Sequence, residues 1–334
     1  MNAPPDSSAI RIEAHAPVGA AAAAPAAAAV AGVDAVSTAG RGLHRLACVH
    51  VLATFCLIAF GASVTSNDAG LAVPDWPATY GHLNPLAPYL RGLVSGLIAL
   101  EHNHRVFAMG VGLLTIALLV AVLRQPAAPA VRRLAWVLLV GVCVQGGFGG
   151  LTVLFKLPAA VSILHGMVAQ AFFCGSIAIA YLLSAERRDQ AAASSRPLAI
   201  EALAIRSAAR GFVVACVVQL FLGALVRHTV AKSRVPTFGD LPVVLHMLFA
   251  LAVRVALVHL VARLVASAGV DARTRRAALG AGAAVMVQLL LGLLAVATRT
   301  DPLVTVLHVI TGAAILGTAC LVALRADRLG ERVP

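Results

Sequence analysis

Long apolar stretches dominate the pattern of hydrophobic and polar positions in this chain, and charged residues gather in the short segments between them. Eight such stretches follow residue 41. Most have about 20 residues, the length of helix that crosses a bilayer core of about 30 Å. We predict spans over residues 46–64, 93–123, 134–154, 161–183, 211–226, 243–265, 277–297 and 303–324. The chain is therefore predicted to be an all-α integral membrane protein with one short span, the fifth.

Composition and charge support this prediction and exclude two other classes. Of all residues, 60% are hydrophobic and 12% are charged, whereas a soluble domain averages about 25% charged residues. The net charge of +12 would suggest nucleic-acid binding in a soluble protein. Here most Lys and Arg residues fall in segments on the side of the N-terminus, as expected for cytoplasmic loops. We predict a multi-pass protein of the plasma or inner membrane with both termini cytoplasmic and no nucleic-acid partner.

The segments outside the spans carry little sign of further domains. Residues 1–40 are rich in Ala and Pro and are predicted to be a disordered cytoplasmic tail. Residues 191–205 are predicted to be a cytoplasmic linker, and residues 326–334 a second tail. All six cysteines fall within apolar stretches, so neither a disulfide framework nor a zinc site is predicted.

Polar residues repeat along the chain and divide it into two halves. A glutamine precedes a glycine by four residues in three odd-numbered spans, at Gln145, Gln219 and Gln288, and Leu57 takes that place in the first span. Histidines in successive even-numbered spans are 61 residues apart in the first half and 62 in the second. We predict two four-helix halves, residues 41–190 and 206–325, as a parallel repeat about an axis along the membrane normal.

The four repeating histidines, one in each even-numbered span, are His104, His165, His246 and His308. Ionisable side chains are costly inside a bilayer, so they indicate a functional site. One histidine on each of two facing helices can ligate a heme iron from both sides. A single histidine of this kind is more typical of an interhelical hydrogen bond, but four with twofold periodicity favour heme ligation.

Charged residues accompany the first of these histidines. His102 and His104 point about 200° apart on a helix, and the repeat favours His104 as the ligand. Glu101 lies on the His104 face, where it either takes part in chemistry or pairs with Arg105 or supports the histidine. Its counterpart in the second half is Val243. This asymmetry suggests a reaction site in the first half and an electron-transfer cofactor in the second.

The roles of the remaining polar residues in the spans stay open at this point. Arg105 and Arg254 are candidates to pair with heme propionates or with buried carbonyl groups. The three glutamines are more typical of interhelical hydrogen bonds than of ligands. His50 and His259 have no repeat partners and are interpreted as structural.

The sequence VPDWPATYG at residues 73–81, the string EHNHR at residues 101–105 and the spacing of the other histidines resemble the heme A synthase family over nearly the whole chain after residue 41. The resemblance implies that a methyl group of heme O is oxidised to a formyl group by successive hydroxylations, giving heme A for terminal oxidases. It implies these roles in this chain: a heme b cofactor on His246 and His308, the substrate heme between His104 and His165, and Glu101 as the catalytic carboxylate. Arg105, from its charge beside His104, is predicted to contact the substrate heme. Heme O synthase and an unidentified electron donor are the expected partners, besides the lipid bilayer.

One departure and one rival interpretation accompany this resemblance. Some family members carry a cysteine pair where this chain has Val73 and Thr79, so a mechanism that uses thiols outside the membrane cannot operate here. A diheme cytochrome b-like protein that carries electrons would also explain four histidines and a repeat. It would not explain a carboxylate beside only one histidine pair. A transporter or assembly factor with structural histidines is the third interpretation.

Overall fold

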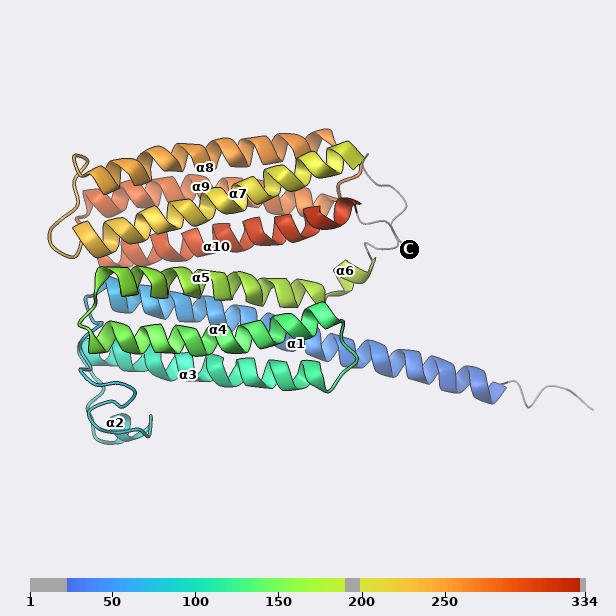
Figure 1. Ribbon diagram of the computed structural model, residues 1–334, viewed down its shortest axis with the longest axis horizontal. Coiled ribbons are helices and arrows are strands. Elements are labelled where there is room, and N and C mark those ends of the chain that lie inside the picture. Colours follow the sequence, from blue (N-terminus) through green and yellow to red (C-terminus); the bar gives the residue numbers. More distant parts are fainter. Residues whose placement is uncertain (1–22, 190–198, 331–334) are drawn as a thin grey trace, which may run out of the picture. The chain divides into compact units, whose positions relative to one another are not determined.

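A computed structural model describes the backbone of residues 23–189 and 199–330, and within those ranges the protein is built from helices. The elements are α1 (Ala23–Ser66), α2 (Ala87–Leu90), α3 (Gly96–Leu123), α4 (Pro129–Leu154), α5 (Ala159–Leu182), α6 (Ala185–Asp189), α7 (Ala199–Leu225), the π-helical turn η2 (Val226–Val230), α8 (Leu241–Ala266), α9 (Ala272–Ala297), α10 (Pro302–Asp327) and the 3-10 turn η3 (Arg328–Gly330) (Figure 1).

Eight of these helices are long and apolar enough to cross a membrane, as predicted. The predicted boundaries were wrong for the fifth span, which is a continuous helical segment of 31 residues, Ile200–Val230. The prediction began at residue 211 because two arginines precede it. The helix nevertheless starts at Ala199, inside the predicted linker, because Ile205, Ala209 and Phe212 all pack in the core. Residues 190–198 of that linker lie outside the described residues.

The chain ends also differ from the predicted tails. Residues 1–22 and 331–334 lie outside the described residues, but α1 begins at Ala23, within the segment predicted to be disordered. Alanine has the highest helix propensity, and proline is tolerated in a first turn, where Pro25 lies. At the other end, α10 continues to Asp327. The described part of the chain divides after Gly42 into two units, and all side-chain contacts below belong to the second.

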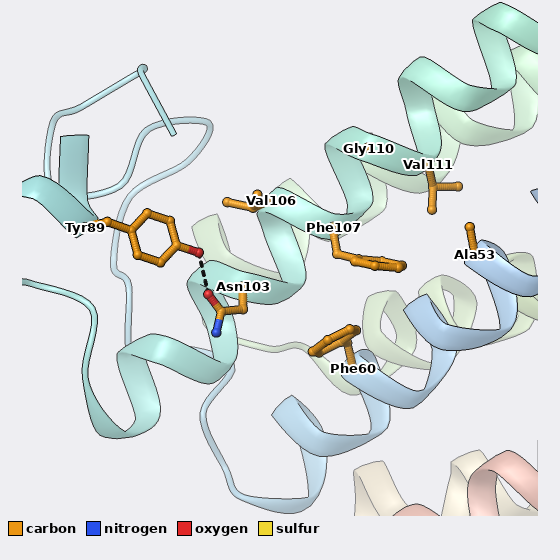
Figure 2. A pocket seen from close by; sticks show the side chains of 8 residues that line it. All are labelled: Ala53, Phe60, Tyr89, Asn103, Val106, Phe107, Gly110 and Val111. Carbon is orange, nitrogen blue, oxygen red and sulfur yellow. Dashed lines mark hydrogen bonds between the residues drawn. The ribbon is translucent and has the colours of Figure 1, made fainter. Parts of the chain in front are cut away.

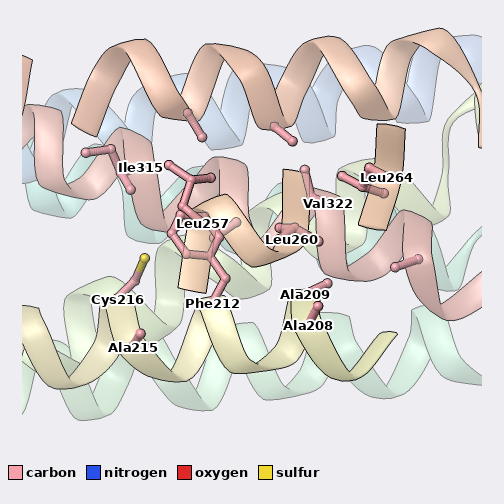
Figure 3. Close-up of a cluster of buried hydrophobic side chains, with 14 of the residues drawn as sticks. Ala208, Ala209, Phe212, Ala215, Cys216, Leu257, Leu260, Leu264, Ile315 and Val322 are labelled. Carbon is pink, nitrogen blue, oxygen red and sulfur yellow. The ribbon is translucent and has the colours of Figure 1, made fainter. Parts of the chain in front are cut away.

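Each predicted half has its own hydrophobic core. One cluster joins α7, α8, α9 and α10 through residues such as Phe212, Leu257, Leu260 and Ile315 (Figure 3). The other joins residues 43–66 of α1 with α3, α4 and α5. The repeat that would relate the two halves stays a prediction.

The halves meet along α5 and α10. Phe173 of α5, Ala313 of α10 and Ile58 of α1 form a small buried cluster at this contact. A Cβ on Gly317 would lie 2.8 Å from side-chain atoms of both Phe173 and Ile177, so α10 approaches α5 closely only because residue 317 is a glycine. The cores of the two halves are therefore directly joined.

Candidate functional site

The four predicted histidines share one local arrangement, in which each imidazole packs against a glycine of a neighbouring helix. A Cβ built on that glycine would lie 3.0–3.3 Å from the histidine Cε1 atom. The pairs are Gly61–His104, Gly149–His165, Gly223–His246 and Gly292–His308. A larger residue at any of these four glycines would displace the ring, so the glycines make the histidine positions possible. The sequence shows the repeated glycines but not their contact with the histidines.

The three helix glutamines hold the histidines by hydrogen bonds between helices. The Nε2 amides of Gln145 and Gln219 each donate to the backbone carbonyl of the histidine opposite, His165 or His246, at 3.0 Å. The Nε2 amide of Gln288 lies 3.1 Å from the His308 Nε2 atom. The predicted interhelical role of the glutamines is confirmed, since each one joins two neighbouring helices at a histidine.

The His246 and His308 rings are spaced as a shared metal ion would require. Their centroids are 6.2 Å apart with an interplanar angle of 63°. A metal–nitrogen bond of about 2 Å, followed by about 1 Å from the nitrogen to the ring centre, places two trans imidazoles about 6 Å apart. The His308 Nδ1 atom is buried without a hydrogen-bond partner among the described residues, whereas the Gln219 Nε2 amide lies 3.2 and 3.3 Å from the two ring nitrogens of His246. The spacing of the two rings therefore fits a bis-histidine heme.

The first-half pair is His104 on α3 and His165 on α5, and each ring packs against a glycine of a neighbouring helix. Both Nδ1 atoms are buried and have no hydrogen-bond partner among the described residues. Ring nitrogens must be neutral and free to bind iron. This pair is therefore also suited to a heme.

Glu101 and Arg105 fasten the segment between α1 and α3 to the site. Glu101 is 3% exposed; its carboxylate pairs with Arg105 and accepts a 2.8 Å hydrogen bond from the Val73 N–H group. Arg105 also donates to the carbonyl groups of Val73, Asp75 and Ala78 at 2.7–3.0 Å. These contacts favour a loop-holding role for Arg105 over the predicted contact with a heme propionate.

His102 has a separate role from His104, as the helix geometry predicted. Its Nδ1 atom lies 3.1 Å from the Thr79 hydroxyl group, and its Nε2 atom lies 3.0 Å from the Pro85 carbonyl group. Both ring nitrogens are thus engaged by the loop. Val73 and Thr79 are buried in this chain, and each is joined to α3 by a hydrogen bond.

A tight turn completes the loop over the site. The Asp75 carboxylate accepts hydrogen bonds from the N–H groups of Tyr80 and Gly81 at 2.8 and 2.7 Å. Burial alone would raise the pKa of Asp75, but these bonds lower it below its ordinary value. The Trp76 indole packs directly on the α4 backbone, since a Cβ on Gly150 would lie 2.6 Å from it. The loop is therefore anchored to both α3 and α4.

Comparison with known proteins decides the family. The model of the cytochrome oxidase assembly protein family matches residues 3–177 and 98–242, which together cover more than half of the chain. The chain belongs to this family.

Relatives of this chain carry the name heme A synthase. The protein from Symbiobacterium thermophilum is 28% identical over 56% of this chain and 60% of its own length. The protein from Shewanella oneidensis is 32% identical over 45% of this chain and 49% of its own length, and that from Caulobacter sp. is 35% identical over 34% of each. The chain thus spans between a third and three fifths of the relatives that it matches.

The other polar residues that the sequence singled out within the spans are His50, Arg254 and His259. His50 is fully buried, and its Nε2 atom lies 2.9 Å from the Thr115 hydroxyl group, which confirms its structural role. Arg254 is exposed on α8, eight residues beyond His246. Eight residues turn an α-helix by about 800°, which is about 80° beyond two full turns, so the two side chains point in different directions. His259 is exposed on the same helix.

Proposed function

We propose that this protein is a heme A synthase that oxidises a methyl group of heme O to a formyl group by successive hydroxylations. The observation that carries the proposal is the fourfold glycine–histidine arrangement in a member of the cytochrome oxidase assembly family. In this proposal His246 and His308 hold a heme b cofactor, and His104 and His165 bracket the substrate heme. Bound heme b supplies one-electron transfer.

The asymmetry between the two halves supports the assignment of the reaction to the first half. Only the first half has a buried carboxylate, Glu101, three residues before its first histidine; the equivalent residue of the second half is the buried Val243. In a dry site, a fixed negative charge stabilises positive charge that develops nearby, or accepts a proton. We therefore assign Glu101 as the catalytic carboxylate, held in place by the Val73 N–H group and Arg105.

The location and partners of the protein follow from the same proposal. The excess of Lys and Arg on the N-terminal side of the helices supports a plasma-membrane protein with cytoplasmic termini. The electron donor is a separate partner, since all six cysteines lie within helices and none lies in the loop over the site. Heme O synthase is the expected source of substrate, because apolar heme O is best transferred within the membrane.

Expression in a host that makes heme O but lacks its own heme A synthase tests the proposal. Extraction and chromatography of pigments should reveal heme A with the wild-type protein. Glu101→Gln keeps an oxygen that can accept from Val73 but removes the charge, so heme A should disappear while the protein folds. Thr79→Val, which removes only the loop contact with His102, is the control and should keep most activity.

Other outcomes of this experiment point elsewhere. Two protohemes per chain with heme O left unconverted would refute the synthase and support the electron-carrying diheme cytochrome. An equal loss of heme A in Glu101→Gln and Thr79→Val would indicate that Glu101 only holds the loop and takes no part in the reaction.

A further inference from the structure

A groove between α1 and α3 opens beside the first histidine pair. We call it the α1–α3 groove; its volume is about 440 Å³, within the range of about 300–1,000 Å³ of small-molecule sites. Figure 2 shows the aromatic rings of Phe60 and Phe107 facing each other in it, 5.0 Å apart between centroids. At one end the Tyr89 hydroxyl group donates to the Asn103 side-chain oxygen. Toward the other end the floor is Gly110, whose missing side chain leaves open space.

The groove is lined by residues that adjoin His104 and its glycine along the chain. Phe60 directly precedes Gly61, the glycine against which the His104 ring packs. On α3, Asn103 directly precedes His104, and Phe107 lies three residues beyond it, on the same side of the helix. The polar end of the groove therefore lies next to His104 along α3.

The groove also has a direction and an opening. From Asn103 to Gly110 is seven residues, or about 10 Å along α3. Over this length the lining changes from the polar Tyr89–Asn103 pair to apolar side chains only. Phe60, Tyr89 and Gly110 are exposed on the surface of the helices, so the groove faces the surrounding lipid and a chain lying in it can extend into the bilayer.

This order of polar and apolar surface matches one part of heme O. Its isoprenoid chain begins with a hydroxyl-bearing carbon next to the macrocycle and continues as hydrocarbon. We propose that the α1–α3 groove holds this tail, with the hydroxyl group at Tyr89 and Asn103 and the hydrocarbon across Phe60, Phe107 and Gly110. The inference rests on the proposed function, since it takes the substrate to be heme O.

Filling the groove tests the proposal. Gly110→Leu places a side chain in it, and Gly112→Leu is the matched control; a Cβ at either glycine meets nothing within 4 Å, and Gly112 points about 200° away on the same helix. The purified protein is titrated with heme O and, separately, with protoheme, which lacks the tail. Gly110→Leu should raise the Kd for heme O at least tenfold and leave that for protoheme unchanged. Gly112→Leu should change neither.

The outcomes separate this inference from the proposed function. An unchanged Kd for heme O in Gly110→Leu would overturn the inference and indicate that bulk lipid fills the groove. An equal rise in the Kd of heme O and of protoheme would also overturn it. Wild-type protein that binds heme O no more tightly than protoheme would also overturn it. If heme A never forms but Gly110→Leu still weakens only heme O, the tail site stands and the proposed reaction fails. Tyr89→Phe, which removes the hydroxyl contact, should weaken heme O alone.

Discussion

Gly223 on α7 offers the sharpest test of how the histidines are held. Its Cα lies so close to His246 that a Cβ on residue 223 would be 3.0 Å from Cε1 and 3.5 Å from Nδ1 of the ring. Carbon atoms make their best contact at about 3.5–4.0 Å. Gly223→Ala therefore requires the imidazole to move by about 0.5–1 Å, more than the tolerance of about 0.2 Å in a metal–ligand bond.

The expected size of the effect follows from the cost of overpacking. Inserting a methyl group into a packed site costs about 1–3 kcal/mol, and if that cost falls on ligand binding, heme affinity drops about 5- to 150-fold. The polypeptide itself should not be destabilised, because Ala is favoured over Gly in a helix by about 1 kcal/mol. Loss of heme from a folded protein is thus the predicted result.

Absorbance spectra give the heme content per chain of purified wild type, Gly223→Ala and a control, Gly211→Ala. Gly211 lies on the same helix, and a Cβ there meets nothing within 4 Å, so the control should keep its heme. The same substitution at Gly149, where the Cβ would be 3.3 Å from His165, should have a smaller effect on the first-half site. Full heme content with an unchanged spectrum in Gly223→Ala would refute the reasoning.

Three further predictions concern other contacts. Gln288→Leu removes a hydrogen bond to His308, and such a bond contributes about 0.6 kcal/mol and at most about 1.7 kcal/mol in membranes. The temperature at which heme is released should therefore fall only slightly. A loss of bound heme as large as in His308→Ala would contradict this prediction. Hydrogen bonds from Arg234 and Thr237 lower the pKa of Asp240, so the stability they add is present above about pH 4 and is lost as the pH falls through the native pKa. Asp240→Asn should therefore speed proteolysis of residues 231–239 at pH 7, with the difference from wild type shrinking in acid; a difference that is constant with pH would argue against the ion pair. A membrane-impermeant maleimide should leave heme A formation unchanged, because all six cysteines lie within helices; inhibition would place a thiol in the electron route.

The sequence by itself determined the spans and the candidate histidines. Hydrophobic runs of helical length have no stable place except in a bilayer, so eight spans could be read directly. Their ends could not, because charged residues such as Arg206 can lie on the same continuous helix as an apolar span, as they do on α7. The separation of His102 from His104 also needed only helix geometry.

The tertiary structure decided what each polar residue contacts. Spacing alone left Glu101 with several roles, and only the folded loop brings the Val73 N–H group and Arg105 to its carboxylate. The glycines opposite the histidines lie 16 to 43 residues away in sequence. Their importance arises from the distance between helix axes, which depends on the packing of all the side chains between them. A periodicity fixes which face a residue occupies, but only the packed helices fix what lies across from it.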